Sequence, residues 1–190
     1  MCQYTSEDGF ANDWHLVHLG SRAVGGAALI IQEASAVSPE GRISASDLGI
    51  WKDEHLDMYQ KINDFIHQHG AIAGIQLAHS GRKASTTPPW EGGQQVTTAQ
   101  GGWQTVAPSA IPFREGDAAP VALDQDGIQK VKDDFKAAAL RSLNAGYKVI
   151  EIHAAHGYLI HQFLSPLSNH RSDEYGGSFE NRIRFLMEIL

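Results

Sequence analysis

The chain has 190 residues and a formal net charge of −7, from 15 Lys and Arg against 22 Asp and Glu. This acidic balance argues against a protein that tracks the phosphates of nucleic acids. Apolar residues make up 42% and charged residues 19%, which is typical of a globular domain. The one cysteine, Cys2, excludes an internal disulfide framework and a cysteine-rich zinc site.

No apolar run approaches the roughly 18 residues that a membrane span requires. No basic and then apolar leader opens the sequence either. We therefore expect a soluble, cytoplasmic protein without nucleic-acid or membrane partners, folded as one domain over 1–190.

The first predicted helix begins at Asn12, a residue type that caps helices, and ends at Gly25-Gly26. The run 28–31 that follows is continuous and rich in β-branched side chains, as in a strand buried on both faces. The apolar residues assigned to this helix are Trp14, Leu16, Val17 and Ala23.

Two further helix-and-strand units follow. Asp53 is predicted to cap a helix that ends at Gly70, before a strand over 72–78. Asp124 is predicted to cap a helix that ends at Gly146, before a strand over 149–153, and Ser178 opens a fourth helix. The apolar stripes are Met58, Ile62, Phe65 and Ile66 on the second helix, and Ile128, Val131, Phe135, Ala138 and Leu143 on the third.

Strands that alternate with amphipathic helices predict a parallel α/β sheet. The connections that leave the strands are long, and such proteins place their chemistry at the carboxyl ends of strands. Residues 84–123 are predicted to form a long loop on this active face. A loop of that length, here with Trp90 and Trp103, is usually a lid or a binding loop.

The densest group of chemically capable side chains is His153, His156 and Tyr158. Two imidazoles three residues apart can converge on one carbonyl oxygen or small anion. A phenol with a pKa of about 10 is a proton donor at neutral pH. The competing interpretation is that both histidines are packing or capping groups.

Other residues at the predicted strand ends leave alternatives open. His79, His153 and His156 are together a candidate zinc site of a metal-dependent barrel hydrolase, although no Asp or Glu completes it at the last strand end. Gln76 offers a donor and an acceptor to the edge of a planar heterocycle. Cys2 is either a small buried residue or a cofactor contact. Lys83 and Arg82 either hold an anionic group or are solvated.

Several motifs occur in a recognisable order: Cys2-Gln3-Tyr4, 33–37, Gly41-Arg42, 76–83, 107–109, 153–158, 163–169, 173–178 and Asn181-Arg182. Together they resemble the old yellow enzyme family of FMN-dependent ene-reductases, and most of all its bacterial branch of NADPH dehydrogenases and xenobiotic reductases. The resemblance covers the whole chain, and the segments 153–158 and 173–182 are highly specific in combination.

The resemblance implies a TIM (β/α)8 barrel with FMN at its mouth and NADPH or NADH as electron donor. The substrates it implies are enones, enals, nitro compounds or nitrate esters. Tyr158 would protonate the substrate, and His153 and His156 would bind its oxygen, as donors aimed where negative charge develops. By the same resemblance Met1, Cys2, Ala34 and Gln76 would contact the flavin, and Tyr4 and Lys83 the substrate.

The predicted elements cover about half of such a barrel, from the end of strand 1 to the start of helix 4. A whole barrel has eight units and about 250 residues, with its phosphate site after strands seven and eight. We therefore expect a fragment that by itself binds FMN weakly or not at all. A catalytically incompetent half barrel is a further alternative, and the resemblance allows a homo-oligomer for the full-length protein.

Overall fold

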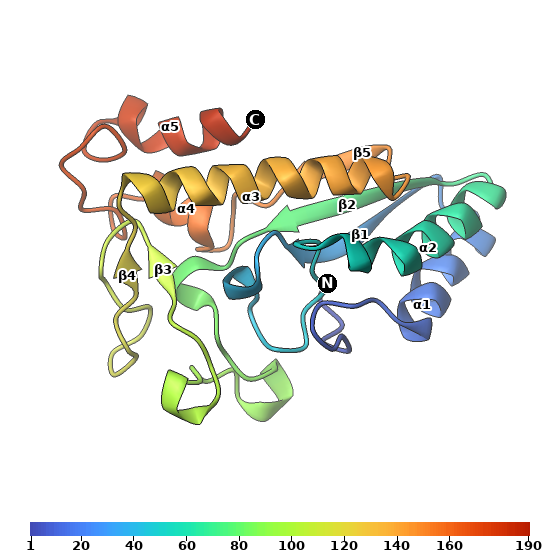
Figure 1. Ribbon diagram of the computed structural model, residues 1–190, viewed down its shortest axis with the longest axis horizontal. Coiled ribbons are helices and arrows are strands. Elements are labelled where there is room, and N and C mark those ends of the chain that lie inside the picture. Colours follow the sequence, from blue (N-terminus) through green and yellow to red (C-terminus); the bar gives the residue numbers. More distant parts are fainter.

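The computed structural model describes residues 1–190 and contains three helix-and-strand units in sequence (Figure 1). The units are α1 (Asp13–Val24) with β1 (Leu29–Ala36), α2 (Leu56–Gln68) with β2 (Ile72–Ala78), and α3 (Gln125–Asn144) with β5 (Val149–Ile152). Two more helices follow, α4 (Leu159–Leu164) and α5 (Phe179–Ile189). No helix combines the length and the apolar character that crossing a lipid bilayer requires.

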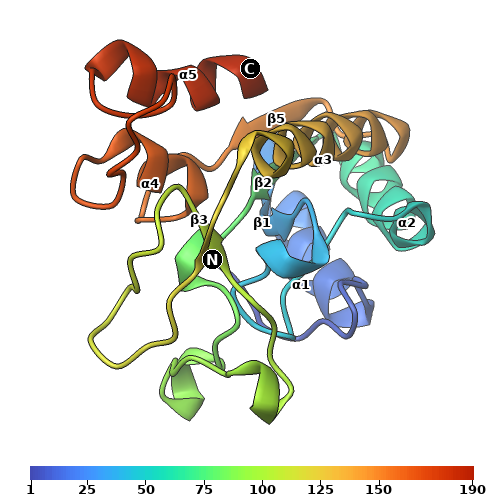
Figure 2. The ribbon, with the colours of Figure 1, turned by 60° about the vertical axis from the view of Figure 1, so that its left-hand side comes forward.

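The three long strands form one parallel sheet in the order β1-β2-β5. Helices α1, α2 and α3 lie on one side of this sheet (Figure 2). Their buried residues pack with Ile30, Ala73 and Ile75 into the core. The predicted parallel α/β architecture is therefore confirmed.

The other face of the sheet, here called the open face, is not covered by a helix. Leu29 and Ile72 are register partners on it, with exposed fractions of 46% and 48%. The prediction that the first strand is buried on both faces is wrong for this reason. The strand also runs beyond 28–31, because Gln32 is satisfied inside the fold by Ser35 and by the Tyr147 hydroxyl.

The helix starts follow the predicted caps, with one exception. Asn12 accepts the N–H of Trp14, Asp124 that of Gly127, and Ser178 that of Asn181. Asp53 is not a cap. It begins a 3-10 turn (Asp53–His55) ahead of α2 and binds Arg141 Nε at 2.6 Å instead.

The apolar stripe predicted for α3 is confirmed in the middle of the helix but not at its end. Ile128, Val131, Phe135 and Ala138 are buried, whereas Leu143 is exposed. On α1 the buried residues are His15, Leu19, Gly20 and Ala23, and Trp14 and Val17 face solvent. On α2 the buried residues are Tyr59, Ile62, Asn63 and Ile66, with Met58 and Phe65 half-buried.

The segment 84–123 leaves the carboxyl end of β2 and returns to α3. It contains two 3-10 turns, Pro89–Glu91 and Thr98–Gln100, and the short parallel strands β3 (Val106–Ala107) and β4 (Val121–Ala122). Arg171 joins the residues that follow the two short strands, because its Nη1 donates to the carbonyls of Pro108 and Leu123.

Candidate active site

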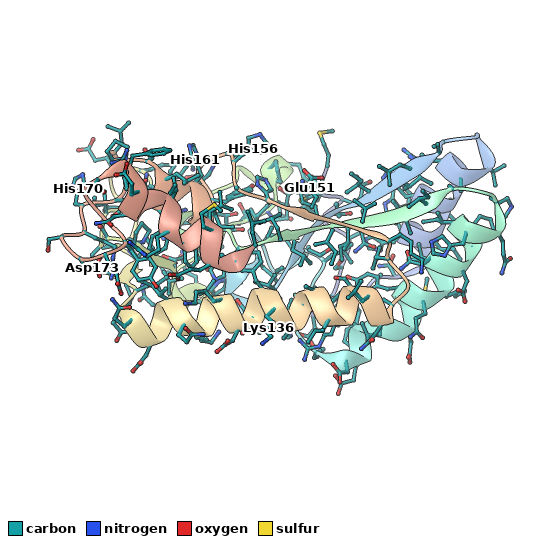
Figure 3. All side chains as sticks on the ribbon, turned by 90° about the horizontal axis from the view of Figure 1, so that it is seen from above. Lys136, Glu151, His156, His161, His170 and Asp173 are labelled. Atoms are coloured by element: carbon teal, nitrogen blue, oxygen red, sulfur yellow. The ribbon has the colours of Figure 1, made fainter.

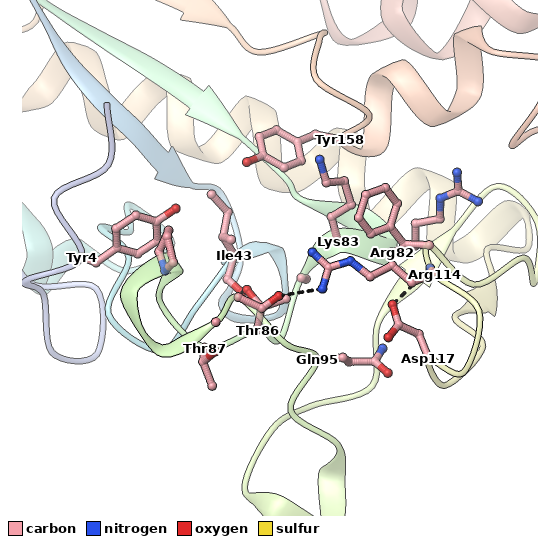
Figure 4. Close-up of a pocket in the computed structure, with 15 residues that line it drawn as sticks. Tyr4, Ile43, Arg82, Lys83, Thr86, Thr87, Gln95, Arg114, Asp117 and Tyr158 are labelled. Carbon is pink, nitrogen blue, oxygen red and sulfur yellow. Dashed lines mark hydrogen bonds between the residues drawn. The ribbon is translucent and has the colours of Figure 1, made fainter.

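A cavity of about 660 Å³ opens on the open face at the carboxyl ends of β1, β2 and β5. All but one of the predicted site residues line it: Met1, Cys2, Tyr4, Ala34, Gln76, His153, His156 and Tyr158. The exception, Lys83, lines an adjoining pocket of about 300 Å³ to which Tyr4 and Tyr158 also belong (Figure 4). The fold thus brings residues from positions 1 to 158 around one space.

The His153–Tyr158 loop follows β5 directly, since the N–H of His153 still donates to Leu77 in β2. The ring centroid of His153 is 5.1 Å from that of His156 and 4.8 Å from that of Tyr158. The turn between them places His156 at a φ of +56° and Gly157 at +74°. A non-glycine residue in this left-handed region costs about 1–3 kcal/mol, and such strain is common at functional sites.

The proton position on His153 follows from its neighbours. The backbone N–H of Ala155 donates to His153 Nδ1 at 3.2 Å, so the neutral ring carries its hydrogen on Nε2. Burial first, and then His156, lower the pKa of His153, whose exposed fraction is 8%. His153 is therefore an uncharged Nε2–H donor at neutral pH.

Tyr158 presents a free hydroxyl to the cavity. Its oxygen has no hydrogen-bond partner within the chain, and burial, followed by Cys2 and Asp47, raises the pKa of the phenol to about 12. Lys83 lies alongside, with Nζ 5.1 Å from the Tyr158 ring centroid and donating to the His156 carbonyl at 2.9 Å. The phenol keeps its proton at neutral pH and is placed to donate it.

Gln162 on α4 holds this loop against the end of β2. Its Nε2 donates to the carbonyls of Gly157 at 2.7 Å and Ser80 at 3.1 Å, and its Oε1 accepts the N–H of Arg82 at 3.2 Å. Gly81 has a φ of +60°, and a Cβ there would lie 2.4 Å from Gln162 Oε1. The Gln162 amide thus fixes the distance between the loop that follows β5 and the residues that follow β2.

A register shift in β1 between Gln32 and Ala34 shapes the cavity wall beneath these donors. Ala34 is opposite Gln76 in the ladder, and both line the cavity. Bulges of this kind turn side chains at the edges of active sites. In the sheet beside the cavity, a Cβ at Gly74 would lie 3.2 Å from Ile31 and 3.3 Å from Val149, so the strands there are close-packed.

This wall fits the planar ring of a flavin. Gln76 Nε2 donates to Glu151 Oε1 at 3.0 Å, while its own Oε1 has no partner and is an acceptor for a ring N–H. Ala34 is small enough for close approach of a ring. Burial raises the pKa of the Cys2 thiol to about 12, which keeps it an uncharged contact.

Glu33, at the bulge, is a cavity residue that the sequence prediction left unassigned. Its Oε2 accepts the N–H of Gln3 at 2.6 Å, and burial raises the pKa of its carboxyl to about 7. The bonded segment carries Cys2 and Tyr4, and Tyr4 has a φ of +51° and an edge contact to Trp90 at 5.6 Å. The sequence signal that could have identified Glu33 is its position, since it is a carboxylate that closely follows the predicted apolar strand 28–31.

The three histidines of the hydrolase alternative do not form a metal site. His79 is buried on the far side of the strand end, where its Nδ1 accepts the N–H of Gly81 at 3.0 Å. Its ring faces Gly41, 3.0 Å from where a Cβ would stand. No three His, Cys, Asp or Glu side chains lie close enough together to hold a metal ion.

Phe113 and Arg114 line the smaller pocket and were also unassigned. They come from the loop 84–123. Because a loop has no helical or strand periodicity, the sequence does not predict which of its side chains face the pocket. Trp103, which the sequence singled out with Trp90, lies outside both cavities and donates its Nε1–H to the Glu40 carbonyl at 2.9 Å.

The chain is similar to known proteins over its whole length. A family model described as the NADH:flavin oxidoreductase / NADH oxidase family matches residues 1–190. The chain is 52% identical to an NADPH dehydrogenase of Bacillus subtilis over 192 residues, and 50% identical to an NADH:flavin oxidoreductase of Gibberella zeae over 194 residues. It is covered completely in both matches but covers 52% and 47% of those proteins, so it spans about half their length.

The chain also covers about half of the length of similar solved structures. Morphinone reductase matches with a TM-score of 0.84 and 33% identity, over all of this chain and 51% of that one. An old yellow enzyme from Pichia matches with a TM-score of 0.85 and 30% identity, over all of this chain and 49% of that one. The chain, with its open three-stranded sheet, therefore corresponds to about half of these α/β barrel structures, as predicted.

Proposed function

Since the chain belongs to the NADH:flavin oxidoreductase / NADH oxidase family, the old yellow enzymes, we propose that it forms the substrate-polarising half of an FMN-dependent oxidoreductase. The substrates are activated C=C bonds of enones and enals, or nitro and nitrate-ester groups, and NADPH or NADH is the electron donor. The observation that carries the proposal is the pair of uncharged donors, His153 Nε2–H and the Tyr158 hydroxyl, on rings 4.8 Å apart in one cavity.

FMN, when bound, supplies the hydride that reaches the β-carbon of the substrate. Met1, Cys2, Ala34 and Gln76 are the residues of this chain that would hold its ring. His153 and His156 orient the substrate and stabilise the negative charge that develops on its carbonyl or nitro oxygen. For an activated C=C bond, Tyr158 donates its phenolic proton to the α-carbon, so that one hydride and one proton are added across the bond.

Tyr4 and Lys83 have supporting parts in this proposal. Tyr4 lines both cavities together with Tyr158, and Figure 4 shows the two side chains at the smaller one. Lys83 donates to the His156 carbonyl and so stabilises the strained turn that presents the imidazole. Tyr4 lines both cavities and Lys83 the smaller one, where substituents of the substrate would lie.

The test separates flavin binding from chemistry. The purified chain is titrated with FMN and followed by visible absorbance, then reduced anaerobically with NADPH and mixed with 2-cyclohexenone. In Tyr158→Phe we expect enone reduction to fall by about 10²- to 10⁴-fold, with FMN affinity and reduction by NADPH unchanged. Tyr175→Phe is the matched control, because the Tyr175 hydroxyl binds Glu188 far from the cavity.

An unchanged rate in Tyr158→Phe would refute the assigned proton donor. Bound FMN that accepts electrons but never passes them to an enone would favour the catalytically incompetent half barrel. Because the chain spans half the length of its relatives, we expect weak FMN binding, and excess FMN is used throughout.

A further inference from the structure

The smaller pocket, about 300 Å³, is a continuation of the main cavity rather than a separate depression. Tyr4, Ile43, Pro89 and Tyr158 line both spaces. A ligand whose reacting group lies beside Tyr158 therefore has a path into the smaller pocket. Figure 4 shows Lys83 and Arg114 reaching into this pocket, with Lys83 next to Tyr158.

The cations of this pocket have no acidic partners. Lys83, Arg114 and the adjacent Arg82 take part in none of the chain's ion pairs. The one carboxylate in the lining, Asp117, accepts the backbone N–H of Arg114 at 3.2 Å. In a chain with a net charge of −7, three unpaired cations at one pocket are a local feature and not a consequence of composition.

The two inward cations keep free donors. Arg114 Nη1 donates to the carbonyl of Gly93 at 3.1 Å and lies 3.5 Å from Gln94 Oε1, which leaves Nε and Nη2 without partners. Lys83 Nζ donates to His156 and has two N–H groups left. Such donors, a planar guanidinium with an ammonium beside it, match the oxygens of a carboxylate or a phosphate.

Phe113 and Arg82 hold these cations in place. The Phe113 ring centroid is 4.7 Å from Lys83 Nζ and 5.6 Å from Arg114 Cζ, so the ring lies against both. Arg82 Nη1 donates to the carbonyls of Ile111 and Pro112, which anchors the turn just before Phe113. The pocket is built by contacts within the chain and is not a chance cluster of solvated side chains.

We propose that Lys83 and Arg114 bind an anionic group, a carboxylate or a phosphate, of the ligand whose reacting part lies at Tyr158. Two ligands of the proposed reaction can supply that group: an acceptor with a carboxylate substituent, or the phosphorylated nicotinamide donor. The position of the reacting part rests on the proposed function, whereas the binding of an anion to the pocket does not.

The first experiment needs neither flavin nor turnover. Inorganic phosphate is titrated into the chain while the amide NMR signals of Gly92 and Gly93, which line the pocket, are followed. We expect saturable shifts in the wild-type chain and about 10- to 100-fold weaker binding in Arg114→Gln, since one charge-assisted hydrogen-bonded partner is lost. Arg114→Lys keeps the charge and should retain part of the affinity.

Lys136→Gln is the charge-matched control. Lys136 is exposed on α3 and lies on the other side of the molecule from His156 (Figure 3). The Lys136→Gln variant should bind phosphate with the same affinity as the wild-type chain. Equal affinities in Arg114→Gln and Lys136→Gln, or no saturable shift at Gly92 and Gly93, would overturn the proposal.

The second experiment identifies the source of the anion in the FMN-loaded protein. Binding of 4-carboxycinnamaldehyde is compared with that of its methyl ester, and binding of NADPH with that of NADH. If Arg114→Gln removes the preference for the acid, the acceptor supplies the group; if it removes the preference for NADPH, the donor does. If neither preference changes, the proposal is overturned. Phosphate binding that depends on Arg114 in a chain without enone reduction would refute only the proposed function.

Discussion

The backbone N–H of Gln3 donates to the Glu33 carboxylate at 2.6 Å, which ties the segment carrying Cys2 and Tyr4 to strand β1. Glu33 itself lies at the register shift of the strand, beside Ala34. One buried carboxyl group therefore positions residues on two walls of the cavity.

Glu33 should make stability depend on pH. Burial raises the pKa of its carboxyl from an ordinary 4.5 to about 7, so the folded state favours the protonated form. This contribution is fully present below pH 4.5 and is lost as the pH rises through 7. At about 1.4 kcal/mol for each pKa unit, the loss is at most about 3.5 kcal/mol.

Urea unfolding at several pH values between 4.5 and 8 checks this expectation. Glu33→Gln keeps an acceptor for Gln3 but cannot ionise, so the decline of the unfolding free energy between pH 5 and 7 should shrink. Glu54→Gln, at an exposed position, should unfold with the wild-type pH profile. If the unfolding free energy of Glu33→Gln declined by the same amount as that of the wild-type chain, a group other than Glu33 would cause the decline.

His153 should be observed as the Nε2–H tautomer at neutral pH. The reason is the Ala155 N–H, which occupies Nδ1, together with burial that lowers the pKa of the ring. Long-range ¹H–¹⁵N NMR correlations report the tautomer directly, and His153→Gln identifies the signal. A ring protonated at Nδ1, or a titration midpoint above 6.5, would contradict the assigned donor.

Gln162→Ala should destabilise the fold by about 2–3 kcal/mol, because it leaves the buried carbonyl of Ser80 and the N–H of Arg82 without partners. The unfolding free energy from urea denaturation measures this effect. Gln68→Ala, at an exposed residue of α2, should change it by less than about 0.5 kcal/mol. Equal effects of the two substitutions would show that Gln162 is not a structural anchor.

The open face should bind an apolar dye. Leu29, Ile31 and Ile72 are each at least 40% exposed on it, and such a patch is unusual on a folded surface. We expect the fluorescence of anilinonaphthalene sulfonate to rise with the folded chain and to fall markedly in the double variant Leu29→Ser, Ile72→Ser. Val17→Ser changes an equally exposed apolar residue on α1 and should leave the signal as it is.

Local signals in the sequence were sufficient for the three helix-and-strand units and for the helix after Ser178, but the short helix α4 (Leu159–Leu164) was not predicted. Asn12, Asp124 and Ser178 cap their helices as predicted, because capping depends on residues within one turn. The prediction that Asp53 caps a helix was wrong, because its carboxylate binds Arg141, which is 88 residues away. The burial of His15 on α1 against Glu33 could not be predicted, because no periodicity of apolar residues marks a buried histidine.

The sequence alone determined the alternation of the three helix-and-strand units, the family, and eight of the residues that line the main cavity. These follow from short-range patterns, and from motifs whose order is a property of the chain. Only the tertiary structure decided that His79 stands apart from His153, that Glu33 holds the segment of Cys2 and Tyr4, and that Arg114 joins Lys83 in a second pocket. Such contacts join residues far apart in the chain, and their distances depend on how the sheet and the long loop pack.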